Sequence, residues 1–114
     1  MAQVMAGWVP DVGDVVGVQF DLQVGHEQAG HRPALVLSPQ RYNAKRGMLI
    51  CCPMTSQIKG YVFEVVASRD PPSVILADQI KSLDWRARGA TKQGQVSAEM
   101  LADVRAKLKS LLGL

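Results

Sequence analysis

A nine-residue segment near the N-terminus, GHEQAGHRP at residues 25–33, holds the types of side chain that metal-independent cleavage of RNA requires. In that reaction a base removes the proton of the ribose 2′-hydroxyl, donors stabilise the phosphoryl oxygens, and an acid protonates the 5′-oxygen. Glu27, His26 or His31 could transfer protons, and the planar guanidinium of Arg32 could bind a phosphate. Alternatively, Glu27 and Arg32 only pair with each other, and the histidines are surface or packing residues.

A second polar segment, TSQIKG at residues 55–60, follows an apolar run and carries hydroxyls, an amide and an ammonium group. Such groups donate hydrogen bonds to phosphate oxygens and to the edges of bases. Thr55, Ser56, Gln57 and Lys59 are therefore candidates for contacts with a nucleic acid. An ordinary polar turn is the alternative interpretation.

Three further candidates lie later in the chain. Asp78 and Gln79 follow a short apolar run, and their side chains could hydrogen-bond to unstacked bases or could form a turn at a strand end. Trp85 could stack on a base, or it could belong to the core or to a contact between two copies of the chain.

The cysteines and histidines do not support a metal site. Cys51 and Cys52 are neighbours, so on a strand they point to opposite faces, and an ordinary disulfide between them is not expected. The chain has only two histidines and no second pair of cysteines. We predict two buried thiols, no metal and no other cofactor.

The charges of the first half are segregated along the sequence. Residues 11–27 contain acids without lysine or arginine, whereas residues 28–63 contain lysine and arginine without an acid. The formal net charge is +3 at pH 7. This pattern favours a basic surface for an anionic partner, although solvated charges on scattered loops would produce the same pattern.

A length of 114 residues predicts one domain, residues 9–114, after an N-terminal extension of residues 1–8. So short a chain leaves apolar surface uncovered, which favours a homo-oligomer. No apolar run approaches the roughly 20 residues that cross a bilayer. Because the N-terminus also lacks the pattern of a signal peptide, we expect a cytosolic protein.

Alternating apolar residues predict short strands, and the C-terminal segment predicts one helix. The helix would begin after Ser97, a good N-cap, and end at Gly113, with Met100, Val104 and Leu108 in one apolar stripe. Residues 39–47 are interpreted as a turn or a short helical link, with Asn43 and Gly47 as breakers. The predicted strands are residues 15–20, 34–38, 48–53, 61–66, 74–77 and 80–83, with part of 88–96. This order favours a small β-barrel with a helix packed across it.

Several motifs occur in an order that resembles one known family. They are VPDVGD (9–14), GHEQAGHRPALVLSP (25–39), YN (42–43), TSQIKGYVFEV (55–65) and ADQIKSLDWRARGA (77–90), followed by the amphipathic helix. This order is similar to that of the MazF/PemK toxins, in particular the MazF–ChpA branch, and the resemblance covers residues 9–113. No single motif is specific, but their spacing together is.

The resemblance implies a mainly β fold, the small SH3-like barrel of MazF, PemK (Kid) and CcdB with a C-terminal helix, assembled as a homodimer. It implies the toxin of a type II toxin–antitoxin system, an endoribonuclease that cuts single-stranded RNA or mRNA at a short sequence, with ACA as the implied core. The products would be a 2′,3′-cyclic phosphate and a 5′-hydroxyl, and the result growth arrest. A MazE-like antitoxin would lay an acidic C-terminal segment across the RNA groove.

The family's essential arginine and threonine correspond to Arg32 and Thr55, and Glu27 corresponds to a loop glutamate near that arginine. We expect Arg32 to stabilise charge at the scissile phosphate, because its pKa above about 12 makes it a poor proton shuttle. Thr55 would donate to a phosphoryl oxygen. Glu27, or a water that it orients, is the candidate base. RNA recognition would fall to the mobile loops and to His26, Gln28, His31, Ser56, Gln57, Lys59, Asp78 and Gln79.

Two departures from the family patterns matter. His26 matches a histidine of PemK-type members, whereas other MazF proteins carry a different residue at that position. The arginine that PemK-type members carry two residues before the aspartate is here Leu76. A His–Arg–Asp arrangement therefore cannot be assembled from the matching positions. This favours the version that uses Arg32 and Thr55 and leaves His26 as a helper.

Two other functions are compatible with a barrel of this kind. One is a gyrase poison like CcdB, whose chains end in Trp-Gly-Ile. Here the end is Leu112, Gly113 and Leu114, so the key tryptophan is missing. The other is a barrel that binds RNA or DNA without cutting it, which the basic stretch would permit.

Overall fold

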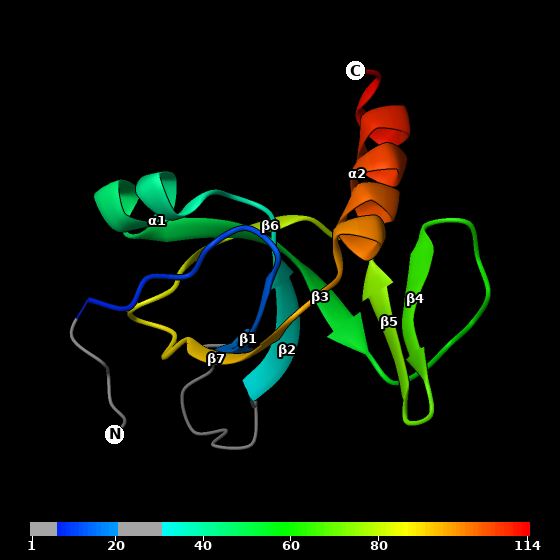
Figure 1. Cartoon of the computed structure of the whole chain (residues 1–114), viewed down its shortest axis with the longest axis horizontal. Coiled ribbons are helices and arrows are strands. Elements are labelled where there is room, and N and C mark those ends of the chain that lie inside the picture. The colour runs from blue at the N-terminus through cyan, green and yellow to red at the C-terminus, as the bar shows by residue number, and fades with distance from the viewer. Residues whose placement is uncertain (1–6, 21–30) are drawn as a thin grey trace.

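The structure, a computed structural model, describes residues 7–20 and 31–114 and has the mainly β architecture that the sequence predicts, with a C-terminal helix (Figure 1). Its strands, in chain order, are β1 (Asp14–Gln19), β2 (His31–Val36), β3 (Met48–Thr55), β4 (Glu64–Arg69), β5 (Pro72–Leu76), β6 (Lys81–Asp84) and β7 (Thr91–Gln95). Its helices are α1 (Gln40–Arg46) and α2 (Ala98–Leu112).

Strand β3 is the centre of the fold. Strands β7, β1, β2 and β3 follow one another as antiparallel neighbours. The first half of β3 pairs with β6 on its other side, and its last two residues, Met54 and Thr55, pair instead with β5 of the β4–β5 hairpin. In Figure 1, β3 therefore runs across the molecule from α1 toward that hairpin. Changing partners along one long strand curls the sheet into a partial barrel.

The two faces of β3 contribute to two different apolar clusters. Cys51 packs with Val16, Val36 and Leu49 in the first cluster, whereas Cys52 packs with residues of β2, β5 and α2 in the second. Both cysteines are free and buried. The prediction that neighbouring thiols point to opposite faces is therefore confirmed.

Helix α2 has the caps that the sequence predicts. Ser97 Oγ accepts a hydrogen bond from Met100 N at 3.1 Å, and Gly113 ends the helix with a φ of 73°. Val104 and Leu108 are buried in the second cluster. Toward the C-terminus the apolar stripe emerges from the core, because 55% of Leu112 is exposed.

Asn43, which the sequence suggests as a helix breaker, instead lies inside α1 and is fully buried. Its side chain accepts from Ser38 Oγ at 2.6 Å and donates to the carbonyl of Pro10 at 2.8 Å. Its own carbonyl accepts from Trp85 Nε1 at 2.9 Å. Trp85 is only 5% exposed and meets Trp8 edge-on, so it is a core residue and not a surface for stacking bases.

Several strand boundaries differ from the prediction, and two of them move candidate residues. Strand β2 begins at His31 rather than residue 34, and β3 continues to Thr55 rather than stopping at residue 53. Strand β4 begins only at Glu64, because Gly60 has a φ of 83° and Glu64 N donates to the carbonyl of Tyr61 in a turn. The expected strand from residue 61 is thus wrong in its first three residues.

Candidate active site

Arg32 and Thr55 stand on strand ends, not on loops as expected. The pairing between β2 and β3 ends with Ala34 opposite Pro53. Beyond that pair, Arg32 lies two residues before Ala34 on β2, and Thr55 lies two residues after Pro53 on β3. There β3 turns to Val74 of β5. Because side chains alternate along a strand, Arg32 and Thr55 belong to the same face of this ladder. The topology thus brings both to the place where β2 and β3 separate.

The surroundings of Arg32 leave its charge available. Arg32 is exposed. Within residues 7–20 and 31–114, no carboxylate lies in ion-pair distance of its guanidinium, and the salt bridge recorded there joins Lys92 to Asp14 at 3.7 Å. His26, Glu27 and Gln28 lie outside the described residues, so a pairing of Arg32 with Glu27 stays a hypothesis.

His31 is used in part for packing. Its Nε2 lies 3.0 Å from the carbonyl oxygen of Gly89, which ties the start of β2 to the turn before β7. A Cβ atom on the neighbouring Gly17 would clash with Gln93 Nε2, so glycine there leaves room for the Gln93 side chain, whereas its 3.4 Å approach to the His31 ring is ordinary contact. His31 nonetheless remains exposed next to Arg32.

The loop after Thr55 is held by a glutamate that the sequence did not single out. Glu64 is 9% exposed, and its carboxylate accepts hydrogen bonds from Lys59 N at 3.1 Å and from Gly60 N at 2.7 Å. Ser56, Gln57 and Lys59 expose their side chains on this loop. We call Arg32, Thr55 and residues 56–60 together the β2–β3 edge. An acid four residues after a Lys-Gly turn was the signal available in the sequence.

Asp78 and Gln79 are exposed in the turn between β5 and β6, and Asp78 already has a partner. Its Oδ1 accepts a hydrogen bond from Tyr61 Oη at 2.9 Å. This hydrogen bond, with the nearby negative charge, raises the pKa of Tyr61 above its usual value, because a phenolate would face the Asp78 carboxylate. The structure thereby joins two segments that were expected to contact RNA independently.

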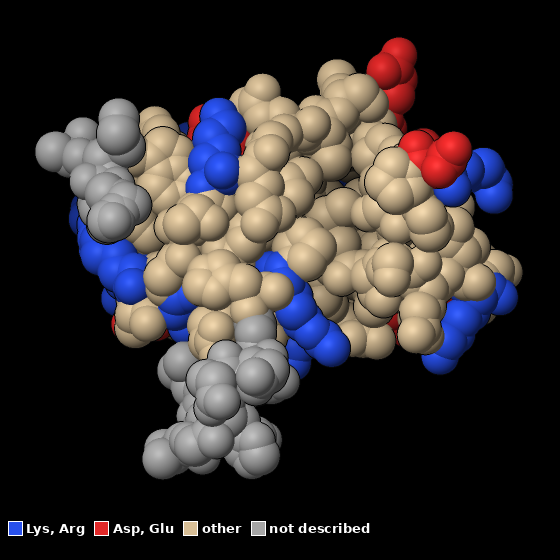
Figure 2. All heavy atoms as spheres, turned by 90° about the horizontal axis from the view of Figure 1, so that it is seen from below, with Lys and Arg blue, Asp and Glu red and all other residues tan. Residues whose placement is uncertain are grey.

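Lysine and arginine side chains are distributed over the face shown in Figure 2, with few acids among them.

The two cysteine thiols do not contribute to the surface, because both are buried. Burial raises the pKa of Cys51 and of Cys52 to about 12, so both are protonated at neutral pH and poor nucleophiles.

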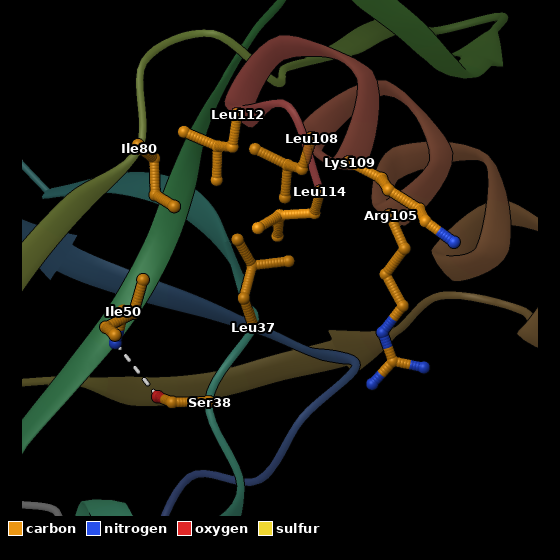
Figure 3. Close-up of a pocket in the computed structure, with 9 residues that line it drawn as sticks. All are labelled: Leu37, Ser38, Ile50, Ile80, Arg105, Leu108, Lys109, Leu112 and Leu114. Atoms are coloured by element: carbon orange, nitrogen blue, oxygen red, sulfur yellow. Dashed lines mark hydrogen bonds between the residues drawn. The ribbon is translucent and has the colours of Figure 1, made fainter.

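A concave region lies beside α2 and is almost entirely apolar (Figure 3). It is a pocket of about 430 Å³, which we call the α2 groove. In Figure 3 the leucines point toward one another, whereas the charged ends of Arg105 and Lys109 point away from them. The lining residues are Leu37, Ser38, Ile50, Ile80, Arg105, Leu108, Lys109, Leu112 and Leu114. Its lining residues include no acidic side chain, histidine or thiol.

The geometry of the β2–β3 edge acquires a context from known proteins. Residues 11–112 match the family described as PemK-like, MazF-like toxins of type II toxin–antitoxin systems. The chain belongs to this family. The resemblance seen in the sequence is thereby confirmed, and the family match spans both strands that carry Arg32 and Thr55.

Relatives from this family align with most of the chain. The endoribonuclease toxin MazF of Escherichia coli K12 is 57% identical over 107 residues, which cover 93% of this chain and 96% of the relative. The endoribonuclease toxin ChpB of the same strain is 34% identical and covers 88% of this chain and 91% of its own length. PemK of Escherichia coli is 28% identical. These values agree with the placement in the MazF–ChpA branch.

Solved MazF structures share the fold. A crystal structure of MazF from Deinococcus radiodurans superimposes with a TM-score of 0.83 at 50% identity and covers 94% of this chain and 99% of its own. A MazE–MazF complex from the same organism reaches a TM-score of 0.83 at 46% identity, with 94% and 98% covered. The fold class of the family is therefore confirmed. In the described ranges, no helix is both long and apolar enough to cross a membrane.

Proposed function

We propose that this chain is a toxin that cleaves single-stranded RNA, mainly mRNA, without a metal ion and at a specific short sequence with an ACA core. Cutting mRNA in the cytoplasm would stop translation and arrest growth. The observation that carries the proposal is the placement of Arg32 and Thr55 on neighbouring strand ends of a MazF-family fold. An exposed guanidinium and a hydroxyl at the same end of two neighbouring strands are suitable donors for a phosphate.

In the proposed reaction the ribose 2′-oxygen attacks the adjacent phosphorus, the 2′-O–P bond forms, and the P–O5′ bond breaks. Arg32 and the Thr55 hydroxyl stabilise the negative charge on the phosphoryl oxygens as it grows. Glu27, or a water that it orients, removes the proton of the 2′-hydroxyl, with His26 as a helper. A proton is delivered to the departing 5′-oxygen. The ends produced are a 2′,3′-cyclic phosphate and a 5′-hydroxyl.

Recognition of the RNA sequence falls to groups around this pair. Single-stranded RNA displays unstacked bases that side chains read by hydrogen bonds to their edges. The proposed readers are His26, Gln28, His31, Ser56, Gln57, Lys59, Asp78 and Gln79. Of these, the described residues are exposed.

We further propose a homodimer and a MazE-like antitoxin whose acidic C-terminal segment covers the RNA site. The Deinococcus radiodurans MazF crystallised with MazE supports the second partner. The excess of lysine and arginine over residues 28–63 supports an acidic segment, because charge complementarity speeds association.

The test is incubation of the purified protein with a long RNA in EDTA, with the cut sites mapped by primer extension. We expect cuts at one short sequence and 5′-hydroxyl ends. Binding that weakens steeply with salt, without scission, would instead support a non-catalytic barrel. Inhibition of gyrase by a protein that leaves RNA intact would support a poison of the CcdB type.

A further inference from the structure

We infer that Glu64 is a positioning residue for RNA cleavage and for reading the RNA sequence, an inference that rests on the proposed function. Within residues 7–20 and 31–114 its side chain makes no hydrogen bond to Arg32 or Thr55. It acts through the loop of residues 56–60, which begins directly after Thr55 and carries Ser56, Gln57 and Lys59.

The Glu64 carboxylate accepts hydrogen bonds from two backbone N–H groups of the loop. Lys59 N lies 3.1 Å from both carboxylate oxygens, and Gly60 N lies 2.7 Å from Oε1. Hydrogen bonds to an ionised acceptor are roughly twice as strong as neutral ones. Because Glu64 is 9% exposed, and the one salt bridge among the described residues lies elsewhere, these amides are the partners that offset its charge.

Little else fixes the loop between Thr55 and Gly60. Gln57 N reaches Thr55 Oγ1 only at 3.3 Å, and Gly60 has a φ of 83° with open space around it. In the parts of the chain that the structure describes, no further hydrogen bond to residues 56–58 is recorded. The orientation of Ser56 and Gln57 therefore depends on where Glu64 holds residues 59 and 60.

A second contact docks the far side of the loop. Tyr61 Oη donates to Asp78 Oδ1 at 2.9 Å, and Ala77 N donates to the carbonyl of Phe63 at 3.0 Å. The loop after Thr55 and the turn that carries Asp78 and Gln79 are thus held together as one surface. A change at Glu64 should disturb both groups of base-reading residues, and it should disturb Thr55 through its neighbour Ser56.

The experiment compares the full-length protein with Glu64→Gln, which keeps the size of the side chain and removes its charge. Cleavage is measured on the RNA site found by primer extension and on the same RNA with one base of that site changed. We expect kcat/KM on the matched RNA to fall by about 10–10²-fold, as misplaced groups cost rate. We also expect the preference for the matched over the changed RNA to shrink.

Three further variants make the result specific. Glu64→Asp keeps the charge on a shorter side chain and should lie between wild type and Glu64→Gln. Tyr61→Phe removes only the hydroxyl that reaches Asp78 and should have a smaller effect on selectivity. Glu99→Gln changes a glutamate of the first turn of α2 and should cleave as wild type does.

A scaffold role would produce a different outcome. If Glu64→Gln only lowers the melting temperature and keeps wild-type KM and selectivity per folded molecule, the inference is wrong. Amide hydrogen exchange of Lys59 and Gly60 provides a readout without RNA. Protection in wild type that is lost in Glu64→Gln supports the contact, and equal exchange in both proteins overturns it. A wild-type protein that cuts no RNA would instead refute the proposed function.

Discussion

The β2–β3 edge and the α2 groove are opposite kinds of surface on one small molecule. At the edge, polar side chains stand on strand ends and on a loop that a buried carboxylate holds in place. In the groove, leucines and isoleucines meet with two cations at the rim and no acid among the lining residues. The difference teaches that Arg32 and Thr55, the donors we propose for a phosphate, are placed by backbone pairing, whereas the groove is shaped by side-chain packing. Substitutions at the edge should change activity, and those beneath the groove should change stability.

The largest effect is expected from an arginine substitution made in each region. Arg32→Ala should lower RNA cleavage by about 10³-fold, the upper range for losing a group that stabilises a transition state. Arg105→Ala, at the rim of the groove, should leave cleavage within about twofold, as expected for a group with no contact to the reacting phosphate. Single-turnover rates on the mapped site measure both. Equal losses in the two variants would break the comparison.

A loss of about 10²-fold is expected for Thr55→Ala, because one donor to the phosphoryl oxygens is removed. Thr55→Ser keeps the hydroxyl and should retain most of the rate, which separates the donor from the methyl group. Circular dichroism should show both variants folded. If Thr55→Ser is as inactive as Thr55→Ala, the hydroxyl is not the group that matters.

Below the groove, Leu108→Ala should lower the free energy of unfolding by about 2 kcal/mol, the lower end for a buried leucine, because its site borders an existing pocket. Chemical denaturation gives this value. The cleavage rate per folded molecule should not change. A reduced rate with unchanged stability would show that the two surfaces are coupled.

The smallest effect on stability at neutral pH is expected from the pKa shifts of the two buried thiols on β3. Folding raises the pKa of Cys51 and Cys52 from 9.0 to about 12, so the folded state holds these protons more tightly than the unfolded chain. Their contribution to stability is complete below pH 9 and is lost as the pH rises from 9 toward 12. Denaturation curves of Cys51→Ala and Cys52→Ala against wild type measure it. Rapid alkylation of the folded protein at pH 7 would contradict the burial.

Features that depend on neighbouring residues in the sequence, such as side-chain alternation and helix caps, were predicted correctly. The alternation of side chains placed Cys51 and Cys52 on opposite faces, and Ser97 and Gly113 marked the ends of α2. Trp85 and the family were also open to sequence reasoning, the first as a core alternative and the second through the order of motifs. For Arg32 and Thr55 the structure corrects the expected position from loops to strand ends, while their roles stay predictions.

Contacts between distant segments explain the errors. Pro33 made residues 31–33 look like the end of a loop, yet Pro33 is part of β2 and pairs with Gly17 of β1. The alternation of Tyr61, Phe63 and Val65 is typical of a strand, but Glu64 and Asp78 hold residues 59–61 in a turn. Asn43 was read as a breaker because its partners, Ser38 and Pro10, are visible only in the folded chain. The roles of Glu27 and the other residues before His31 stay predictions.

The change of partner along β3 has a consequence for how such toxins could diversify. Thr55 pairs with β5, and Glu64 begins the neighbouring strand β4. Both ends of the intervening segment are therefore held by the sheet. Substitutions at positions 56–58 should leave the position of Thr55 and the packing of the core unchanged. Variants in which only these three residues are exchanged should therefore cut RNA at other short sequences and still produce the same cleaved ends.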